Sequence, residues 1–274
     1  MNRLETTIRS TKRLLGLNSR SPIVAGMRPA YDWLLTGLFG RRGLSRVIYG
    51  GEDVRVLPAH RYVEEGYESP VFDYLSKAVR PGAVILDIGA HVGLSAILMA
   101  RWAGPDGHVY AFEPSPQVRA ALTKHLALNG VQDRVIVIDS AVSDRPGRAA
   151  FFAFESSPEG TLSATHSRLP GAQPVDVPVT TVDDFCATRD IAPTVIKIDI
   201  EGYEYHALCG ARKVLERHRP VLVIELHPMN WAEIGLRREA LAGLIADLGY
   251  RLIALENQSD ALSEYGHVAL EPLP

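Results

Sequence analysis

An apolar strand followed at once by a glycine-rich turn and a helix is the feature of this sequence that most restricts its fold. The strand covers residues 84–87, the turn reads Ile-Gly-Ala-His-Val-Gly over 88–93, and a helix is predicted from Val92 to Trp102. A strand that is apolar on both faces belongs inside a parallel sheet covered by helices. Glycines let the backbone approach a ligand closely, and the helix start offers unpaired N–H groups. The pattern predicts an α/β fold with a ligand at the turn.

The alternation of strands and helices continues along most of the chain. Further strands are predicted at 108–112, 135–138, 195–200, 221–224, 251–255 and 267–270, with helices at 115–128, 203–217 and 231–248. Strands separated by helices imply right-handed crossovers and a mostly parallel sheet. Residues 149–154 and 175–182 read as strands without a helix between them, so we expect a β-hairpin-like insertion around a long loop at 155–174.

Composition narrows the class of protein further. The chain has 274 residues, of which 46% are hydrophobic and 22% charged, values typical of one globular α/β domain with additions. A net charge of −3 gives no reason to expect nucleic-acid binding. Two cysteines, Cys186 and Cys209, form no disulfide framework, which favours a reducing, cytoplasmic setting. No apolar run reaches the about 20 residues needed to span a bilayer, and no secretory signal is expected.

The first 46 residues are basic. They hold Glu5 and Asp32 as their acidic residues against nine basic ones: Arg3, Arg9, Lys12, Arg13, Arg20, Arg28, Arg41, Arg42 and Arg46. The simplest interpretation is a pair of accessory helices packed on the main domain. Peripheral contact of residues 1–46 with an anionic membrane, or docking to a partner, is the alternative. We expect a helical, basic extension over 1–66 and a main domain over 67–274.

The residues of the turn select among nucleotide-like ligands. The dinucleotide pattern G-x-G-x-x-G starts at Gly89 and ends near Gly93, but His91 stands where its middle glycine belongs. Asp87 would repel a pyrophosphate and attract an ammonium group. Glu113 ends the second strand, where a carboxylate accepts from both ribose hydroxyls. These residues favour S-adenosylmethionine (SAM) and disfavour an NAD-dependent oxidoreductase.

Asp139 and Ser140 follow the third predicted strand. In a doubly wound sheet this strand ends at the same crevice, so we expect either side chain to reach the adenine amine. Asp139 reads equally well as a surface turn residue.

A second polar group follows two later strands. Lys197, Asp199 and Glu201 alternate with isoleucines, and Glu225 and His227 alternate with apolar residues in the same way. One interpretation is a partly buried ion-pair network around Lys197. The other is catalytic: Asp199 or His227 removes the proton of an acceptor hydroxyl. A divalent cation held by Asp199, Glu201, Glu225 or His227 would serve the same purpose, although the spacing is not a specific metal motif.

The chain resembles the FkbM-type family of class I SAM-dependent methyltransferases. The segments that carry the resemblance, which begins near Tyr67-Glu68, are DIGAHVG (87–93), FEPSP (112–116), the Asn129 region, DSAVSD (139–144), VPVTTVDDF (177–185), IKIDIEGYEYHALCGA (196–211) and PVLVIE (220–225). The run I-K-I-D-I-E-G-x-E is the most specific of them. The resemblance implies a Rossmann-like sheet, mostly parallel, with seven strands of which the last is antiparallel.

The resemblance also implies SAM as methyl donor and O-methylation of a sugar, a glycan or a polyketide-type natural product. The positions that match the family's cofactor site are Glu68, Asp87, Gly89, His91, Gly93, Glu113, Asp139, Ser140 and Ala141. Asp199 falls where the fourth-strand motif meets the transferred methyl. His91 departs from the asparagine of many relatives, but both side chains donate a hydrogen bond. Acceptor specificity is expected from residues 1–60 and from the 155–174 loop, which match nothing in the family.

A hypothesis from another class is a non-catalytic binding module that keeps the fold and docks through its basic N-terminal helices. The presence of Glu113 and of the whole Lys197–Glu201 cluster argues against such a loss of activity. The sequence leaves the oligomeric state open, with a homodimer as one option.

Overall fold

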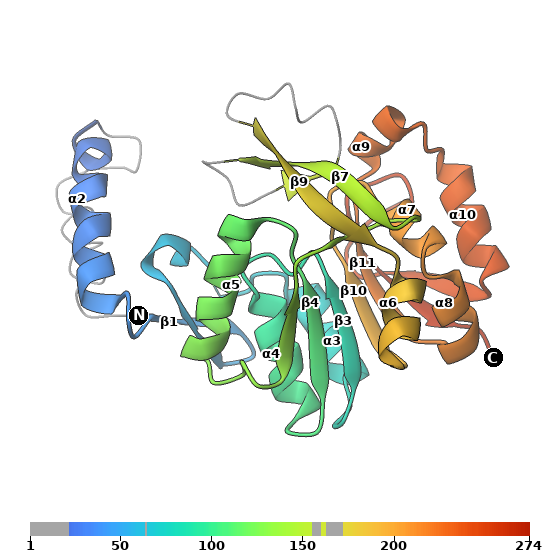
Figure 1. Cartoon of the computed structure of the whole chain (residues 1–274), viewed down its shortest axis with the longest axis horizontal. Coiled ribbons are helices and arrows are strands. Elements are labelled where there is room, and N and C mark those ends of the chain that lie inside the picture. Colours follow the sequence, from blue (N-terminus) through green and yellow to red (C-terminus); the bar gives the residue numbers. More distant parts are fainter. Residues whose placement is uncertain (1–21, 64, 155–159, 163–171) are drawn as a thin grey trace. The chain divides into compact units, whose positions relative to one another are not determined.

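The computed structural model describes residues 22–63, 65–154, 160–162 and 172–274 (Figure 1). These residues form two compact units: the smaller holds the described residues up to 67 together with 124–130, and the larger holds the described residues of 68–123 and 131–274. The division into an extension of residues 1–66 and a main domain of residues 67–274 stays a prediction.

The larger unit is built on a seven-stranded sheet. Its strands, in spatial order, are β12 (Tyr250–Ala254), β13 (Gly266–Pro272), β11 (Val221–Leu226), β10 (Val195–Ile198), β3 (Val84–Ile88), β4 (His108–Phe112) and β5 (Val135–Ile138). β11, β10, β3, β4 and β5 pair in parallel, whereas β13 is antiparallel to both of its neighbours. The predicted Rossmann-like sheet, mostly parallel with an antiparallel last strand, is confirmed.

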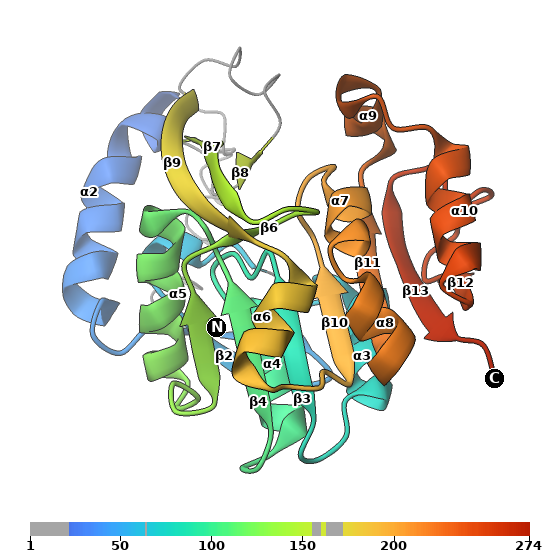
Figure 2. The same ribbon diagram turned by 45° about the vertical axis from the view of Figure 1, so that its right-hand side comes forward.

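Helices cover both faces of this sheet. The helices of the larger unit are α3 (Ser69–Ala78), α4 (Leu94–Ala103), α5 (Pro116–Leu128, which ends in the smaller unit), α6 (Val182–Arg189), α7 (Glu204–Cys209), α8 (Arg212–His218), α9 (Pro228–Trp231) and α10 (Arg238–Asp247). The β3–β4 and β10–β11 crossovers run in opposite directions along the sheet, so right-handed connections put α4 and α8 on opposite faces. Figure 2 shows α6 and α8 side by side in front of the sheet. Phe185 of α6, Leu215 of α8 and Leu244 of α10 belong to one buried cluster that also contains Ile196 of β10.

The predicted β-hairpin-like insertion is confirmed as an antiparallel pair, β7 (Gly147–Phe154) with β9 (Ala172–Thr180). Two short strands extend it to a second, four-stranded sheet: β6 (Ala141–Val142), parallel to β9, and β8 (Gly160–Thr161). Most of the 155–174 loop, namely residues 155–159 and 163–171, lies outside the described residues.

Three elements differ from the sequence-based expectation. The strand predicted over 195–200 ends at Ile198, so Asp199 and Glu201 lie beyond it. The helix predicted over 203–217 is broken at Gly210, between α7 and α8; Gly210 lies so close to Ser143 that a Cβ there would be 2.2 Å from the Ser143 backbone oxygen. The unpredicted helix α6 begins after Thr181, whose hydroxyl accepts from the Asp184 N–H at 2.9 Å and caps the helix.

The smaller unit combines a helix with a hairpin that the sequence analysis did not predict. Its elements are α2 (Pro22–Phe39), β1 (Leu44–Tyr49), β2 (Glu52–Val56) and the short 3-10 helix η1 (Pro58–His60). Gly50 and Gly51 both have positive φ, 55° and 84°, as the favoured two-residue hairpin turn requires. His125 at the end of α5 belongs to this unit, and its Nε2 pairs with the Leu57 N–H at 2.9 Å.

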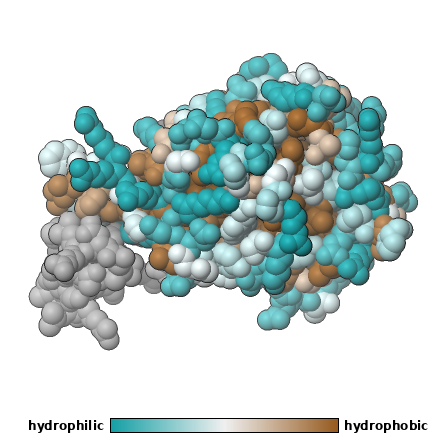
Figure 3. Space-filling model, turned by 90° about the horizontal axis from the view of Figure 1, so that it is seen from below, coloured by the Kyte–Doolittle hydropathy of each residue, from teal (hydrophilic) through white to brown (hydrophobic). Residues whose placement is uncertain are grey.

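In the described part of the chain, large exposed apolar side chains occur on α2 and at several positions elsewhere. On the face drawn in Figure 3, hydrophobic residues are interspersed with hydrophilic ones. On α2, Trp33 is 78% exposed and Leu38 56%. In the described part of the chain, no helix is both long and apolar enough to cross a bilayer. Membrane contact through residues 1–46 stays a prediction, and residues 1–21 lie outside the described residues.

Candidate functional site

The turn after β3 is held against the end of β4. The N–H groups of Gly89 and Ala90 donate to the Phe112 carbonyl at 3.1 and 2.9 Å. Gly89, His91 and Gly93 all have positive φ, at 83°, 52° and 88°, and Gly93 caps the start of α4. This left-handed backbone carries the chain from the strand into the helix in five residues, as expected for a turn that wraps a ligand.

Gly89 also permits a close approach between two strands. A Cβ built there would lie 1.8 Å from the backbone oxygen of Asp199. Gly89→Ala is therefore expected to destabilise the fold by roughly 3 kcal/mol, from the left-handed backbone and the overlap together. The thermal midpoint should fall by roughly 6–12 °C.

Gly82→Ala is the matched control for this substitution. Gly82 has a similar φ of 79°, but a Cβ there meets no atom within 4 Å. It should lose only about 1 kcal/mol, the cost of the left-handed backbone. Equal losses in the two variants, measured by thermal or urea unfolding, would contradict the close approach.

Asp87 and Glu68 present buried carboxylate oxygens without partners. Asp87 is fully buried in β3, and neither of its carboxylate oxygens has a hydrogen-bond partner. Oε2 of Glu68 is likewise buried without a hydrogen-bond partner. Burial raises the pKa of Asp87 to about 6, with Lys197 opposing the shift and Asp199 and Glu68 adding to it. Unpaired buried acceptors are costly unless a ligand supplies donors. A cationic amine fits these two carboxylates.

Glu113 lies just beyond β4 and is 6% exposed. Its Oε1 accepts from the Ser115 N–H at 2.8 Å, and the backbone of His91 also donates to the carboxylate. Burial raises its pKa to about 7, and the two backbone donors and Arg119 act in the opposite direction. The carboxylate is thus fixed beside the glycine turn, where it can accept from ribose hydroxyls.

The residues that follow β5 begin beside Glu113 and continue into the second sheet. The Glu113 N–H donates to the Ile138 carbonyl at 3.0 Å, so Asp139 and Ser140 follow directly on a residue tied to Glu113. Asp139 is exposed and Ser140 half-buried. Ala141 is buried in the second sheet, where it packs with Phe151 and Val177.

Lys197 is buried within β10 and pairs with Asp199. Lys197 lies opposite Asp87 in the β10–β3 register, and its Nζ is 3.2 Å from Asp199 Oδ2. Burial alone would lower the pKa of Lys197, but Asp199, Glu68 and Asp87 raise it overall. Burial opposes ionisation of Asp199, yet Lys197 and a hydrogen bond with Glu225 lower its pKa to about 2. Asp199 is therefore ionised at neutral pH.

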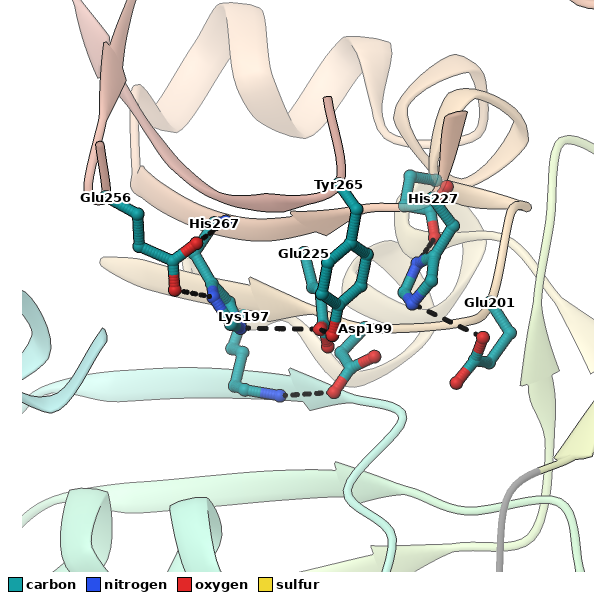
Figure 4. Close-up of polar contacts among 9 residues, drawn as sticks. Lys197, Asp199, Glu201, Glu225, His227, Glu256, Tyr265 and His267 are labelled. Atoms are coloured by element: carbon teal, nitrogen blue, oxygen red, sulfur yellow. Dashed lines mark hydrogen bonds and ion pairs between the residues drawn. The ribbon is translucent and has the colours of Figure 1, made fainter. Parts of the chain in front are cut away.

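His227 lies between two glutamates at the end of β11 (Figure 4). Its Nδ1 is 2.9 Å from Oε1 of the fully buried Glu204, and its Nε2 is 3.3 Å from Oε2 of Glu201. Burial lowers the pKa of His227, but Glu204, Glu201 and Asp199 outweigh it and raise the pKa to about 9. The sequence pattern indicated no role for Glu204, although it is the last residue of the family-specific run.

A further network lies beside this histidine. The Tyr265 hydroxyl donates to Glu225 Oε1, and His267, opposite Glu225 in the β11–β13 register, places Nε2 3.7 Å from the same oxygen (Figure 4). Glu256 holds the other ring nitrogen of His267 at 2.9 Å. Burial raises the pKa of Glu225 to about 8, and Asp199 adds to the shift. Tyr265 and Glu256 were missed, because the loop that carries them has no recognisable pattern.

One group of side chains in the described part of the chain has the composition of a metal site. Asp199, Glu201 and His227 each place a ligand atom within 4.8 Å of the others. Glu225, the fourth residue predicted for such a site, is not part of this group; it contacts Tyr265 and His267 and is hydrogen-bonded to Asp199.

Comparison with known proteins gives a family match and several relatives. The model of the Methyltransferase FkbM domain matches residues 87–252. The 31-O-demethyl-FK506 methyltransferase FkbM of Streptomyces tacrolimicus is 28% identical over 70% of this chain and 81% of its own length. The hexuronic acid methyltransferase AglP of Haloferax volcanii is 26% identical over 58% of this chain and 62% of its own length.

Solved structures of low sequence identity were also matched. An FkbM methyltransferase from Methylobacillus flagellatus has a TM-score of 0.46 at 19% identity over 74% of this chain, which spans 50% of that protein. A SAM-dependent O-methyltransferase from Thermotoga maritima has a TM-score of 0.48 at 12% identity, over 79% of this chain and 68% of its own.

Proposed function

Because the chain belongs to the FkbM family of SAM-dependent methyltransferases, we propose that its acceptor is a hydroxyl oxygen on a sugar, a glycan or a polyketide-type natural product. The observation that carries the proposal is the position of two sets of groups at one sheet edge. Carboxylate oxygens without hydrogen-bond partners occur on Asp87 in β3 and on Glu68, which interacts electrostatically with Asp87, and the Asp199–His227 cluster follows the neighbouring strands β10 and β11. The first set suits an amino-acid tail, and the second suits a hydroxyl that must lose a proton.

The chain's own residues divide the binding of SAM among them. Asp87 and Glu68 would hold the ammonium group, and Glu113 would accept from the ribose hydroxyls. The turn from Gly89 through His91 to Gly93 supports the ligand with its backbone. Asp139, Ser140 and Ala141 would border the adenine. Bound SAM supplies an electrophilic methyl group on a positively charged sulfur.

Asp199 and His227 are the groups proposed to act on the acceptor. Methyl transfer to an alcohol requires the oxygen to be held in line with the methyl group while its proton is removed. Asp199 is ionised and fixed by Lys197, so it can accept a hydrogen bond from the hydroxyl and orient it. His227 is fixed on Nδ1 by Glu204 and faces the same cluster. With its pKa raised to about 9, the ring without a bound cation is protonated at neutral pH, so it would donate a hydrogen bond to the acceptor oxygen rather than remove its proton.

The class of acceptor is proposed from the relatives and from the insertion. FkbM is named for methylation of 31-O-demethyl-FK506 and AglP for a hexuronic acid. In this chain the insertion approaches the end of β10, because the Tyr203 hydroxyl donates to the Leu162 carbonyl at 3.3 Å. We therefore assign acceptor selection to the insertion.

Product analysis tests this proposal. The full chain is incubated with SAM carrying a deuterated methyl group and with a panel of sugars, uronic acids and hydroxylated polyketides, and products are analysed by mass spectrometry and NMR. A labelled methoxy group on one of these acceptors supports the proposal. A label on carbon or nitrogen only would contradict it.

Cofactor affinity is expected to fall as the pH is lowered. The pKa of Glu113 is raised to about 7 in the cofactor-free protein. Below that pH its carboxylate becomes protonated and no longer accepts hydrogen bonds from both ribose hydroxyls. Protonation of Asp87, with its pKa raised to about 6, acts in the same direction. From pH 8 to pH 6 the affinity for S-adenosylhomocysteine, measured by calorimetry, should fall by about tenfold through Glu113 and by about a further twofold through Asp87. Glu113→Gln has no titratable group there and should show a flatter profile.

A further inference from the structure

Three side chains that follow β10 and β11 converge on one point, and we propose that Asp199, Glu201 and His227 bind a divalent metal cation there. Their ligand atoms all lie within 4.8 Å of one another. Asp199 and Glu201 follow β10, and His227 follows β11, so the ends of two adjacent strands fix the arrangement. Figure 4 shows the imidazole of His227 facing Glu201, with Asp199 on the adjoining strand end.

The separations match those between the ligands of one cation. Nitrogen and oxygen ligands lie about 2.0–2.2 Å from Zn²⁺ or Mg²⁺, so adjacent ligands are about 3–3.5 Å apart and opposite ones about 4.2 Å. His227 Nε2 and Glu201 Oε2 are 3.3 Å apart, the spacing of adjacent ligands. No two ligand atoms of the group are more than 4.8 Å apart, which is about 0.6 Å beyond the separation of opposite ligands. Small side-chain rotations would complete the site.

The buried Glu204 gives the histidine the orientation of a metal ligand. Metal-binding histidines almost always donate their second ring N–H to a carboxylate or a carbonyl, which fixes the tautomer. Here Glu204 Oε1 lies 2.9 Å from Nδ1 and also accepts from the Gly202 N–H at 2.7 Å. This bond turns Nε2 toward Glu201 and Asp199. Glu204 is fully buried, so it supports His227 from behind rather than binding the cation.

The mix of ligands indicates the kind of cation. Two carboxylates and one imidazole suit Mg²⁺, Mn²⁺ or Zn²⁺, and three protein ligands leave coordination positions for water or a substrate oxygen. The side chains of Asp199 and Glu201 are 23% and 30% exposed, so solvent and ligands can reach the group. A dication would also offset the repulsion between these two carboxylates.

The consequence for catalysis rests on the proposed function. An acceptor hydroxyl bound to the cation would have a lowered pKa and lose its proton to solvent. Its oxygen then forms a bond to the methyl carbon as the carbon–sulfur bond breaks, and the sulfonium becomes a thioether. Asp199 and His227 would then act on the acceptor through the cation.

Binding of Mn²⁺ alone tests the site without any acceptor. The full chain is stripped with EDTA, desalted and titrated with Mn²⁺, and free Mn²⁺ is followed by electron paramagnetic resonance. We expect one site per chain, weakened at least tenfold in Glu201→Gln and His227→Gln. Glu204→Gln should weaken it by 10–100-fold, as loss of a supporting carboxylate does elsewhere. Glu216→Gln, which alters an exposed carboxylate of α8, is the matched control and should leave the affinity unchanged.

Binding of S-adenosylhomocysteine in the presence of EDTA, with the thermal midpoint of each variant, separates this proposal from the proposed function. Normal cofactor binding without Mn²⁺ binding would overturn the metal site and leave O-methylation standing. Equal Mn²⁺ affinity in the site variants and in Glu216→Gln would place the cation elsewhere and also overturn it. Displacement of Mn²⁺ by Mg²⁺ or Zn²⁺ from the native chain but not from the site variants would support it. Methylation of carbon or nitrogen in the product analysis would remove only the catalytic role, because Mn²⁺ binding is measured without an acceptor.

Discussion

Replacing Glu113 by alanine is expected to weaken binding of SAM and S-adenosylhomocysteine by about 100-fold or more. Its buried carboxylate is held by the Ser115 and His91 backbone, so it can accept from two ribose hydroxyls without reorganising. A hydrogen bond to a charged group contributes about 1.5–3 kcal/mol, and two of them exceed the about 2.7 kcal/mol that corresponds to 100-fold. Calorimetry with S-adenosylhomocysteine measures the change directly, since no acceptor is required.

Two controls separate loss of ligand contacts from loss of structure. Asp133→Ala removes an exposed carboxylate before β5 and should bind the cofactor as the native chain does. Glu113→Ala should unfold within a few degrees of the native chain, because the deleted group is itself destabilised by burial. Unchanged cofactor affinity in a folded Glu113→Ala protein would remove Glu113 from the site.

The sheet and the glycine turn could be predicted because local chemistry determines them. The residues from Val84 to Gly93 favour a buried strand, followed by a turn with left-handed backbone at its glycines and then by a helix. The close approach of Gly89 to Asp199 could not be predicted, because it depends on which strand lies next to β3. The same holds for the close approach of Gly210 to Ser143, a residue of a distant segment.

Most residues that support the site could not be predicted either, because their contacts also depend on distant segments. Asp199 and His227 were identified because charged residues at the end of a buried strand require a partner. Glu204 lies on a short helix, where a glutamate is unremarkable, and only the folded chain brings it to His227. Tyr265 lies in a loop forty positions after Glu225, and it reaches Glu225 because β13, which follows this loop, pairs with β11. The Gly50–Gly51 hairpin, by contrast, had a local turn signal that the sequence analysis did not use.

Asp199→Asn is expected to keep cofactor affinity within about tenfold while turnover falls by about 10³-fold. Asparagine keeps the shape of the side chain but loses the negative charge that orients the acceptor, directly or through a cation. Asp199 is not one of the two carboxylates proposed to hold the ammonium group, so ground-state binding of SAM should change little. A fall in kcat with nearly constant cofactor affinity is the signature of an interaction made in the transition state. Single-turnover rates on the acceptor identified by product analysis measure it.

The neighbouring lysine determines which control this experiment requires. Lys197 is buried and pairs with Asp199, so the variant leaves a buried ammonium group that keeps only Glu68, Asp87 and Glu225 as acidic neighbours. Loss of one partner of a buried pair is destabilising by about 3–5 kcal/mol, which urea unfolding would detect. The Lys197→Met/Asp199→Asn double variant removes both charges and should recover much of that stability but none of the turnover. If turnover returned together with stability, Asp199 would be a structural partner of Lys197 and not a catalytic residue. If cofactor affinity fell as far as turnover, Asp199 would belong to the SAM site instead.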